Sequence, residues 1–373
     1  MHIKQAFILL LTDSLLLSGC TAINTEEQLM AVVMGIDLTD EKHFRVTVKV
    51  PSFSAPQEGG NDSYITLSAE AEVFSAALNR LFDTAPRSLN FSQTRLLLIE
   101  SDALLRDPGL FSTLHTLDDM RSQAMISICR EEAGSLLEKQ KVAVGTRLSR
   151  YIDSTLDHAL KEGVIPDSTL IRTLSQTGGG YQDALLSVLL SAQTQQTSDS
   201  SVPASQQEQQ ESQSPAKKNQ SDVLWTGAAV MDGHRLSGYL SPQETMLCRF
   251  ISGEISTINY RTGDGIYQLT SRLGPHISVE QHPDSFTGSV RGNINLLPLF
   301  NAPVDLHAIA AQLEEDTVKL LHTLQSLRCD ALGIGGLLSR QFMTLSDWEN
   351  SNWKENYLQA EKSVRFTLTL MDE

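Results

Sequence analysis

The cysteine at position 20 closes the stretch of this sequence whose residue types and spacing most clearly predict a covalent chemistry. The stretch reads Leu17-Ser18-Gly19-Cys20, and it follows a short basic start and an apolar run. A leucine, two small residues and a cysteine resemble the bacterial lipobox, in which the thiol receives a diacylglyceryl group before the signal peptide is removed. The small residues admit the peptidase, and only a thiol forms the thioether. The pattern predicts a signal peptide over residues 1–19 and lipid attachment at Cys20.

A protein anchored in this way would work outside the cytoplasmic membrane. The apolar run is too short for a stable membrane-spanning helix, which needs about 20 apolar residues, whereas two acyl chains hold a protein stably on a bilayer. Thr12 and Asp13 interrupt the run and weaken it as a secretion signal. The alternative is an ordinary signal peptide that ends near an unrelated cysteine.

The other three cysteines show no spacing of a metal or redox site. Cys129, Cys248 and Cys329 lie far apart, and no Cys-x-x-Cys pair exists. This spacing argues against zinc and thioredoxin-type chemistry. We expect all three to be small buried apolar residues, and one disulfide among them stays open as an alternative.

Side chains that could catalyse a reaction or bind a metal do not fall into a recognisable pattern. The sequence contains no His-Glu-x-x-His helix, Gly-x-Ser-x-Gly elbow or phosphate loop. His276 and His282 are too loosely spaced for a metal site, and Asp118-Asp119 point in different directions if they lie on a helix. We therefore expect no catalytic, cofactor-binding or metal-binding residue.

Two tryptophans five positions apart, Trp348 and Trp353, could stack on a ligand. Aromatic rings at such spacing more often pack against each other at the edge of a domain. We favour this second interpretation.

Charge and length limit the class of protein. The formal net charge is −16 over 373 residues, and nucleic-acid binding needs a basic face, so we expect no nucleic-acid partner. The charge also argues against electrostatic binding to anionic lipid. About 350 residues after the signal peptide suggest two or three domains.

A polar segment divides the chain. Of the 32 residues of Ser191–Asp222, nine are Gln and eight are Ser. Such a composition cannot bury enough apolar area to offset the entropy of ordering, so it predicts a disordered linker over 191–222. We therefore expect an N-terminal region over 20–190, made of two α/β modules, and a C-terminal α/β domain over 223–373.

Strands and helices are mixed throughout, which predicts an α+β (mixed α/β) class, with several domains that are each a β-sheet flanked by helices. Asp232-Gly233, between two apolar alternations, predicts a hairpin turn. Leucines at helical spacing predict a long amphipathic helix. The expected strands are 44–50, 96–99, 125–129, 225–231, 235–240, 254–260, 276–281, 289–297 and 364–370, and the expected helices are 69–82, 110–119, 131–139, 148–162 and 306–327.

Three stretches of the C-terminal half suggest a family. The first runs from Trp225 through the predicted hairpin to Glu244-Thr245, the second is the sequence Asp-Ala-Leu-Gly-Ile-Gly that begins at Asp330, and the third is Trp348, Trp353 and the terminal strand. In this order they resemble the Ger(x)C family, the lipoprotein C subunits of spore germinant receptors. The N-terminal half agrees more loosely, through Val33-Met34-Gly35-Ile36-Asp37 and Leu117-Asp118-Asp119-Met120-Arg121.

The resemblance implies a fold of three α/β modules and a role without catalysis or cofactor. It implies a complex with a multi-pass A subunit and a permease-like B subunit, which senses small germinants at the outer face of the cytoplasmic membrane, the inner membrane of the spore. Whether the C subunit itself contacts a germinant stays open. Two other classes also stay open, a solute-binding lipoprotein of a transporter and a surface hydrolase.

Overall fold

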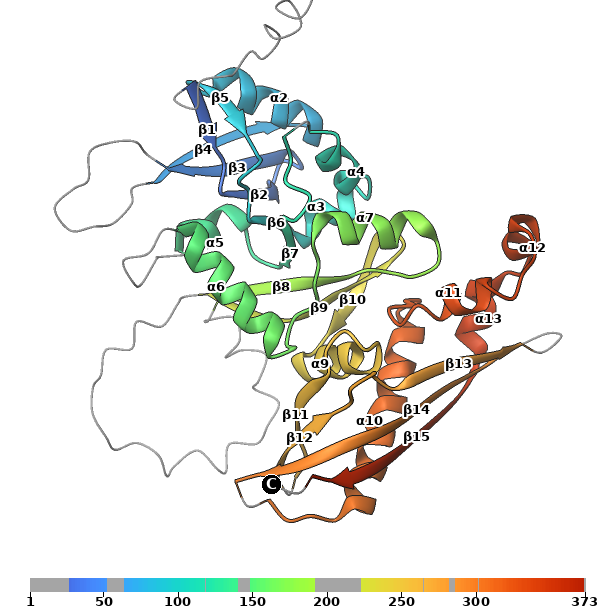
Figure 1. Ribbon diagram of the computed structural model, residues 1–373. Helices are drawn as coiled ribbons and strands as arrows, with labels where there is room; N and C mark the ends of the chain where they lie inside the picture. Colours follow the sequence, from blue (N-terminus) through green and yellow to red (C-terminus); the bar gives the residue numbers. More distant parts are fainter. Residues whose placement is uncertain are drawn as a thin grey trace, which may run out of the picture.

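The computed structural model describes residues 27–51, 64–117, 119–139, 148–191, 223–263, 265–281, 286–300 and 302–371. Helices and strands are mixed along the chain, which confirms the predicted α+β class. We call residues 27–240 the N-terminal unit and residues 242–371 the C-terminal unit (Figure 1). The segments 1–26 and 192–222, which hold the predicted signal peptide and almost all of the predicted linker, lie outside the described residues.

An eight-stranded sheet, the large sheet, forms the centre of the N-terminal unit. Its order is β10-β9-β8-β7-β6-β2-β3-β4, with the four central strands parallel and antiparallel pairs at both edges. The apolar runs of β6 and β7 are buried, as expected for parallel strands covered on both faces. The strands are β2 (Val33–Leu38), β3 (Phe44–Pro51), β4 (Tyr64–Ala71), β6 (Leu96–Glu100), β7 (Met125–Cys129), β8 (Leu185–Ser191), β9 (Val223–Asp232) and β10 (Arg235–Leu240).

Helices cover both faces of this sheet, and each face has its own buried apolar cluster. A short parallel pair, β1 (Gln28–Met30) with β5 (Ser88–Asn90), lies beside it. One face packs against α2 (Phe74–Thr84), α3 (Ser101–Arg106), α4 (Leu110–His115) and α7 (Leu170–Gly179), and the other against α5 (Ala133–Lys139) and α6 (Leu148–Lys161).

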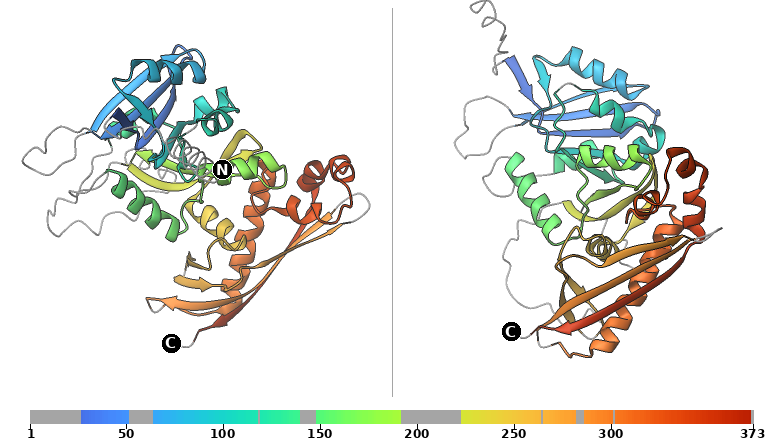
Figure 2. Two further views of the ribbon diagram at one scale, coloured as in Figure 1. Left: turned by 45° about the horizontal axis from the view of Figure 1, so that its top comes forward. Right: turned by 45° about the vertical axis from the view of Figure 1, so that its right-hand side comes forward.

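The C-terminal unit is a smaller sheet, the C-terminal sheet, with one long helix on one face (Figure 2). Strands β12 and β13 follow each other along one edge of β14, and β15 pairs in parallel with its other edge. The leucine stripe of α10 is buried against the sheet, which confirms the predicted long helix. The strands are β11 (Thr257–Arg261), β12 (Ile266–Thr270), β13 (His276–Gln281), β14 (Phe286–Leu299) and β15 (Glu361–Leu370); the helices are α9 (Pro242–Ile251), α10 (Leu306–Ser326), α11 (Ile334–Ser339), α12 (Leu345–Asn350) and α13 (Trp353–Gln359).

The two units share buried residues. Leu185, Ala228, Val230 and Leu240 of the large sheet belong to the same apolar cluster as Phe250 of α9. Strands β9 and β10, which follow the predicted linker, therefore complete the large sheet and also contact the C-terminal unit. The large sheet thus extends across the domain boundary expected at residue 223.

One predicted helix begins too early. Residues 69–71 belong to β4, which pairs with β3 along its whole length, and the helix starts only at Phe74. Pairing with β3 outweighs the local helical pattern of these residues. Helix α9 was not predicted, although its signal is present: Ser241 and Glu244 form a capping box with Pro242 at the first helical turn.

Candidate functional site

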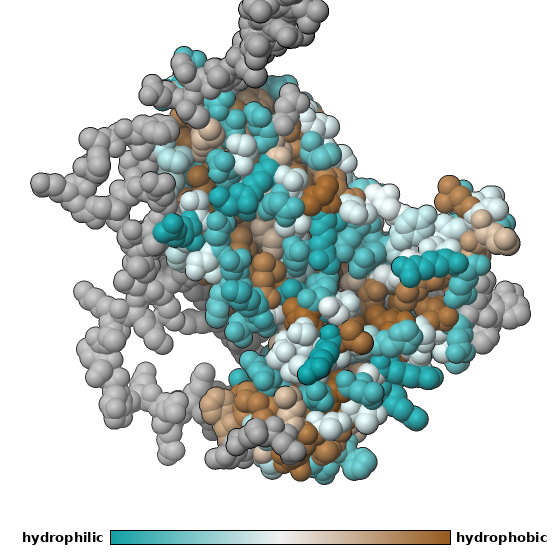
Figure 3. Space-filling view, viewed as in Figure 1, coloured by the Kyte–Doolittle hydropathy of each residue, from teal (hydrophilic) through white to brown (hydrophobic). Residues whose placement is uncertain are grey.

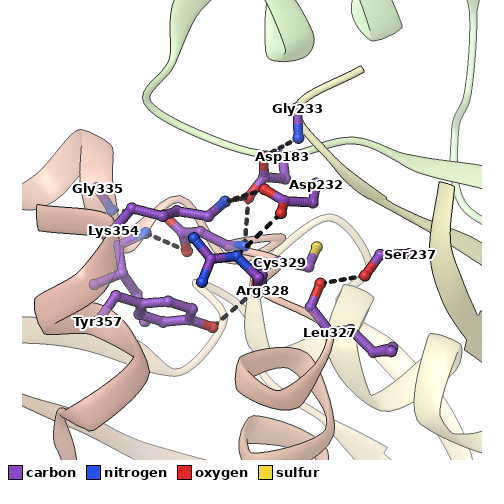
Figure 4. Close-up of polar contacts among 12 residues, drawn as sticks. Asp183, Asp232, Gly233, Ser237, Leu327, Arg328, Cys329, Gly335, Lys354 and Tyr357 are labelled. Carbon is purple, nitrogen blue, oxygen red and sulfur yellow. Dashed lines mark hydrogen bonds and ion pairs between the residues drawn. The ribbon is translucent and has the colours of Figure 1, made fainter. Parts of the chain in front are cut away.

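A polar cluster joins the two units, and we call its five charged residues the junction. Asp183 precedes β8, and Asp232 ends β9 in the N-terminal unit. Arg328 and Asp330 follow α10, and Lys354 lies on α13. Figure 4 shows Arg328 and Lys354 beside Asp183 and Asp232. The loop before β8 and the end of β9 therefore lie against the helices of the C-terminal unit.

The carboxylate of Asp183 is the hub of the junction. It accepts the backbone amide of Gly233, 2.9 Å away, and the backbone amide of Asp330, 2.7 Å away. It also forms an ion pair with the ammonium group of Lys354. The same loop adds two further links. The backbone amide of Asp183 donates to the carbonyl of Asp330, and the side chain of Gln182 donates to the carbonyl of Ala331.

The Asp330 side chain is fully buried and holds the start of α11. Its two carboxylate oxygens accept the amides of Ile334 and Gly335, 2.9 and 2.6 Å away. Burial raises the pKa of this carboxyl from 3.8 to about 7, although the two amide bonds act in the opposite direction. Gly333, at φ +72°, makes the turn between Asp330 and the helix.

Lys354 and Arg328 neutralise the acidic side of the junction. The ammonium group of Lys354 lies 3.3 Å from Asp232 as well as beside Asp183. Burial alone would lower the pKa of Lys354, but its bonds to the two aspartates outweigh burial and raise it. Arg328 binds Asp232 and Glu355, and the bond to Glu355 raises the pKa of its guanidinium group.

The predicted tryptophan pair packs next to the junction, against the start of α11. Trp348 and Trp353 stack with ring centroids 5.4 Å apart, and Trp348 also stacks on Tyr181 of the N-terminal unit. Trp353 lies so close to Gly335 that a β-carbon there would come within 2.7 Å of the ring. The interpretation as aromatic packing is confirmed.

The hairpin β9–β10 fits the same junction. Ser237 donates to the carbonyl of Leu327 over 2.6 Å, and a β-carbon at Gly238 would meet the Leu327 side chain at 2.6 Å. Tyr357 donates to the carbonyl of Cys329, 2.8 Å away. The three C-terminal stretches that suggested a family therefore meet at one place, although they are separate in sequence.

A second buried carboxylate serves the N-terminal unit in the same way. Asp37, at the end of β2, accepts the amides of Ala133 and Gly134 at the start of α5. Burial raises its pKa from 3.8 to about 6. Gly35 lets α5 approach, since a β-carbon there would lie 3.0 Å from Leu137.

An open cleft of about 470 Å³ lies between the end of α6 and the elements α9, β11 and α10. Its lining includes the side chain of Met246 and several charged groups. Two of its acidic side chains already have protein partners, because Tyr260 donates to Asp316 over 2.7 Å and Glu244 closes the capping box with Ser241.

Most of the site residues considered from the sequence lie outside the described part of the chain. Cys20 and the lipobox residues Leu17, Ser18 and Gly19 lie outside the described residues, as do Asp118 and His282. His276 is exposed on β13, and the carboxylate of Asp119 accepts a hydrogen bond from the side-chain amide of Asn90.

The three remaining cysteines are free and buried, as expected for small core residues. Burial raises the pKa of each thiol, at Cys129, Cys248 and Cys329, so all three stay protonated. Within the described ranges, no group of three or more His, Cys, Asp or Glu side chains is arranged to hold a metal ion.

The junction itself was missed at the level of sequence. Asp330 entered only as part of a resemblance, and Asp183 and Lys354 are 171 residues apart. No local pattern marks such a pair.

In the part of the chain that the structure describes, no helix is both long and apolar enough to cross a membrane.

Comparison with known proteins identifies the family. Residues 22–190 match the family model "Spore germination protein N-terminal domain", and residues 226–372 match "Spore germination B3/GerAC like, C-terminal". A solved structure described as "Crystal Structure of the GerBC protein" is similar at 16% identity and a TM-score of 0.47, over 91% of this chain and 97% of that chain. No curated protein sequence matches. Because the two family models cover most of the chain in order, the protein belongs to the Ger(x)C family, the C subunits of spore germinant receptors.

Proposed function

We propose that this chain is a lipid-anchored C subunit of a nutrient germinant receptor, attached through Cys20 to the outer face of the cytoplasmic membrane, which is the inner membrane of the spore. It acts by binding the multi-pass A subunit and the permease-like B subunit, and it performs no catalysis. The family matches support the place in germination. The lipobox-like sequence supports the anchor.

The junction is the observation that carries the proposed binding role. The stretches that match the family by sequence help to tie the two units together. The Asp183 carboxylate binds both Lys354 and the backbone amide of Asp330. Each carboxylate oxygen of Asp330 is already occupied by an amide inside the protein. Such an arrangement favours a rigid body that presents surfaces to partners.

A deletion strain tests the germination role. Spores that lack this chain should form normally but respond slowly to one class of nutrient, and a plasmid copy of the gene should restore the response. Chemical germinants that bypass the receptors should still act on the mutant spores. Normal responses to every nutrient, together with turnover of a substrate by the purified protein, would favour an enzyme instead.

The anchor has its own test. Cys20→Ala should release the protein into the soluble fraction after a high-salt wash, whereas the neighbouring change Thr21→Ser should leave it in the membrane fraction. If the Cys20→Ala protein stays in the membrane fraction, the lipid anchor is refuted.

A further inference from the structure

Among the described residues, helices cover one face of the C-terminal sheet and leave the other face uncovered. Helix α10 packs against the face that carries Tyr267, Ile294 and Phe366. The opposite face, which we call the outer face, carries the alternate residues of β12 to β15. Its side chains are mostly Ser, Thr, Asn and Arg, and strongly hydrophilic residues lie over β13–β15 in Figure 3.

Three basic residues form one row across this outer face. Strand register pairs His276 of β13 with Arg291 of β14, and Arg291 with Arg365 of β15. All three side chains are exposed. Neighbouring strands lie about 4.8 Å apart, so the row is about 10 Å wide. We call it the basic row.

The two arginines stand directly opposite each other, an arrangement that destabilises a sheet because like charges repel. No carboxylate among the described residues forms an ion pair with Arg291 or Arg365. In a chain of net charge −16, two adjacent unpaired guanidinium groups are a feature that folding does not explain.

The surroundings of the basic row offer hydrogen bonds without neutralising it. On one side lies the row of Ser278, Ser289 and Ser363, in which the first two hydroxyls bond over 2.7 Å. Among the described residues of the outer face, the nearest acidic side chains are those of Glu280 and Glu361. They lie one row farther, about 13 Å from the arginines along the strands.

The number of basic side chains in the row indicates which class of partner it can bind. Binding to an anionic bilayer takes a cluster of roughly 4–8 basic residues, and nucleic acid needs a basic stripe that neutralises many phosphates. Two side-by-side guanidinium groups and an imidazole instead match one or two carboxylates, which guanidinium binds in bidentate geometry. We propose that the basic row is the docking site for an acidic segment of a partner protein. This inference rests on the proposed function, because it names the surface through which a subunit would bind.

The test uses the full lipidated chain in detergent and a fluorescein-labelled oligoglutamate peptide as the probe. Fluorescence anisotropy at low ionic strength should show that the peptide binds. Arg365→Glu should raise the Kd about tenfold or more, because it removes one charge-assisted hydrogen-bonded pair. Arg365→Lys should retain part of the affinity. Arg106→Glu, an equal charge change at an exposed site on α3, should leave it unchanged.

Folding of the variant is checked separately. Arg365→Glu places an acidic group opposite Arg291, so its thermal midpoint should be no lower than that of Arg106→Glu. Equal peptide binding by the two variants would overturn the proposal. Binding of the unlipidated Cys20→Ala chain to phosphatidylglycerol vesicles, if Arg365→Glu abolishes it, would also overturn the proposal, in favour of a lipid surface. Neither result bears on whether spores need the protein to germinate.

Discussion

Asp183 and Asp330 bind each other twice through groups of their main and side chains. The amide of Asp330 donates to the carboxylate of Asp183 over 2.7 Å, and the amide of Asp183 donates to the carbonyl of Asp330 over 3.0 Å. One residue precedes a central strand of the large sheet and the other follows the long helix of the C-terminal unit. The pair therefore fixes the position of one unit on the other.

Lys354 should be the side chain whose loss weakens the junction most directly. Lys354→Met removes the ammonium group that pairs with both Asp183 and Asp232, and Asp183 stays largely buried without it. The free energy of unfolding should fall by about 2–4 kcal/mol, between the values for exposed and for fully buried pairs. Urea denaturation measures the change. The control Lys319→Met removes an exposed lysine from α10 and should leave the urea midpoint unchanged; equal effects of the two variants would contradict the role of the junction.

The pH dependence of stability should report on Asp330. Burial raises its pKa from 3.8 to about 7 in the folded protein, so the folded state binds this proton more tightly than the unfolded chain. Its contribution is complete below pH 3.8 and is lost as the pH rises through 7. Asp37 acts in the same direction up to a pH of about 6.

Asp330→Asn removes one of these two titrations. The variant should be less stable by about 1–3 kcal/mol, because an amide can accept only one of the two backbone amides that the carboxylate accepts. Its free energy of unfolding should also decline less steeply between pH 4 and pH 7. Urea denaturation across this range measures both effects, and parallel pH profiles of variant and wild type would show that Asp330 does not titrate there.

Elements with a strong local signal could be predicted from the sequence. The leucine stripe gave α10, and the dipeptide Asp232-Gly233 gave the turn of the β9–β10 hairpin, where Gly233 has φ +60°. The apolar runs of β6 and β7 were found within a residue of their bounds. In each case periodicity or a turn-forming residue decides the structure locally.

Features that depend on distant partners could not be predicted. Residues 69–71 are strand because β3 lies beside them, and β9 belongs to the large sheet because it pairs with β8. The junction is of the same kind, since Asp183 acquires its role only when the C-terminal unit brings Lys354 to it. The basic row likewise exists only through strand register, because its three members are far apart in sequence.

Gly335 should tolerate no side chain. A β-carbon there would meet the face of the Trp353 ring at 2.7 Å, and the ring is held by its stack on Trp348. Gly335→Ala should therefore cost about 1–3 kcal/mol of unfolding free energy and change the tryptophan fluorescence of the folded protein.

The matched control lies in α7. Gly178 has free space within 4 Å of its would-be β-carbon. Gly178→Ala should leave the fluorescence unchanged and be neutral or stabilising by up to about 1 kcal/mol, since alanine favours a helix. If Gly335→Ala behaves like this control, Trp353 is not held tightly against α11.

Residues 192–222 should be replaceable by a two-residue turn. Ser191, the last residue of β8, pairs directly with Val223, the first of β9. An Asn-Gly dipeptide joins two antiparallel strands at such a pair. The segment supplies almost no apolar residues, and a shorter loop costs less entropy to close, so stability should be unchanged or higher by up to about 2 kcal/mol. Thermal unfolding of this variant, beside one with a Gly-Ser segment of the original length, measures the effect. A midpoint many degrees lower in both variants would mean that the native segment packs onto one of the two units, and a loss confined to the short turn would mean that β8 and β9 need a wider connection.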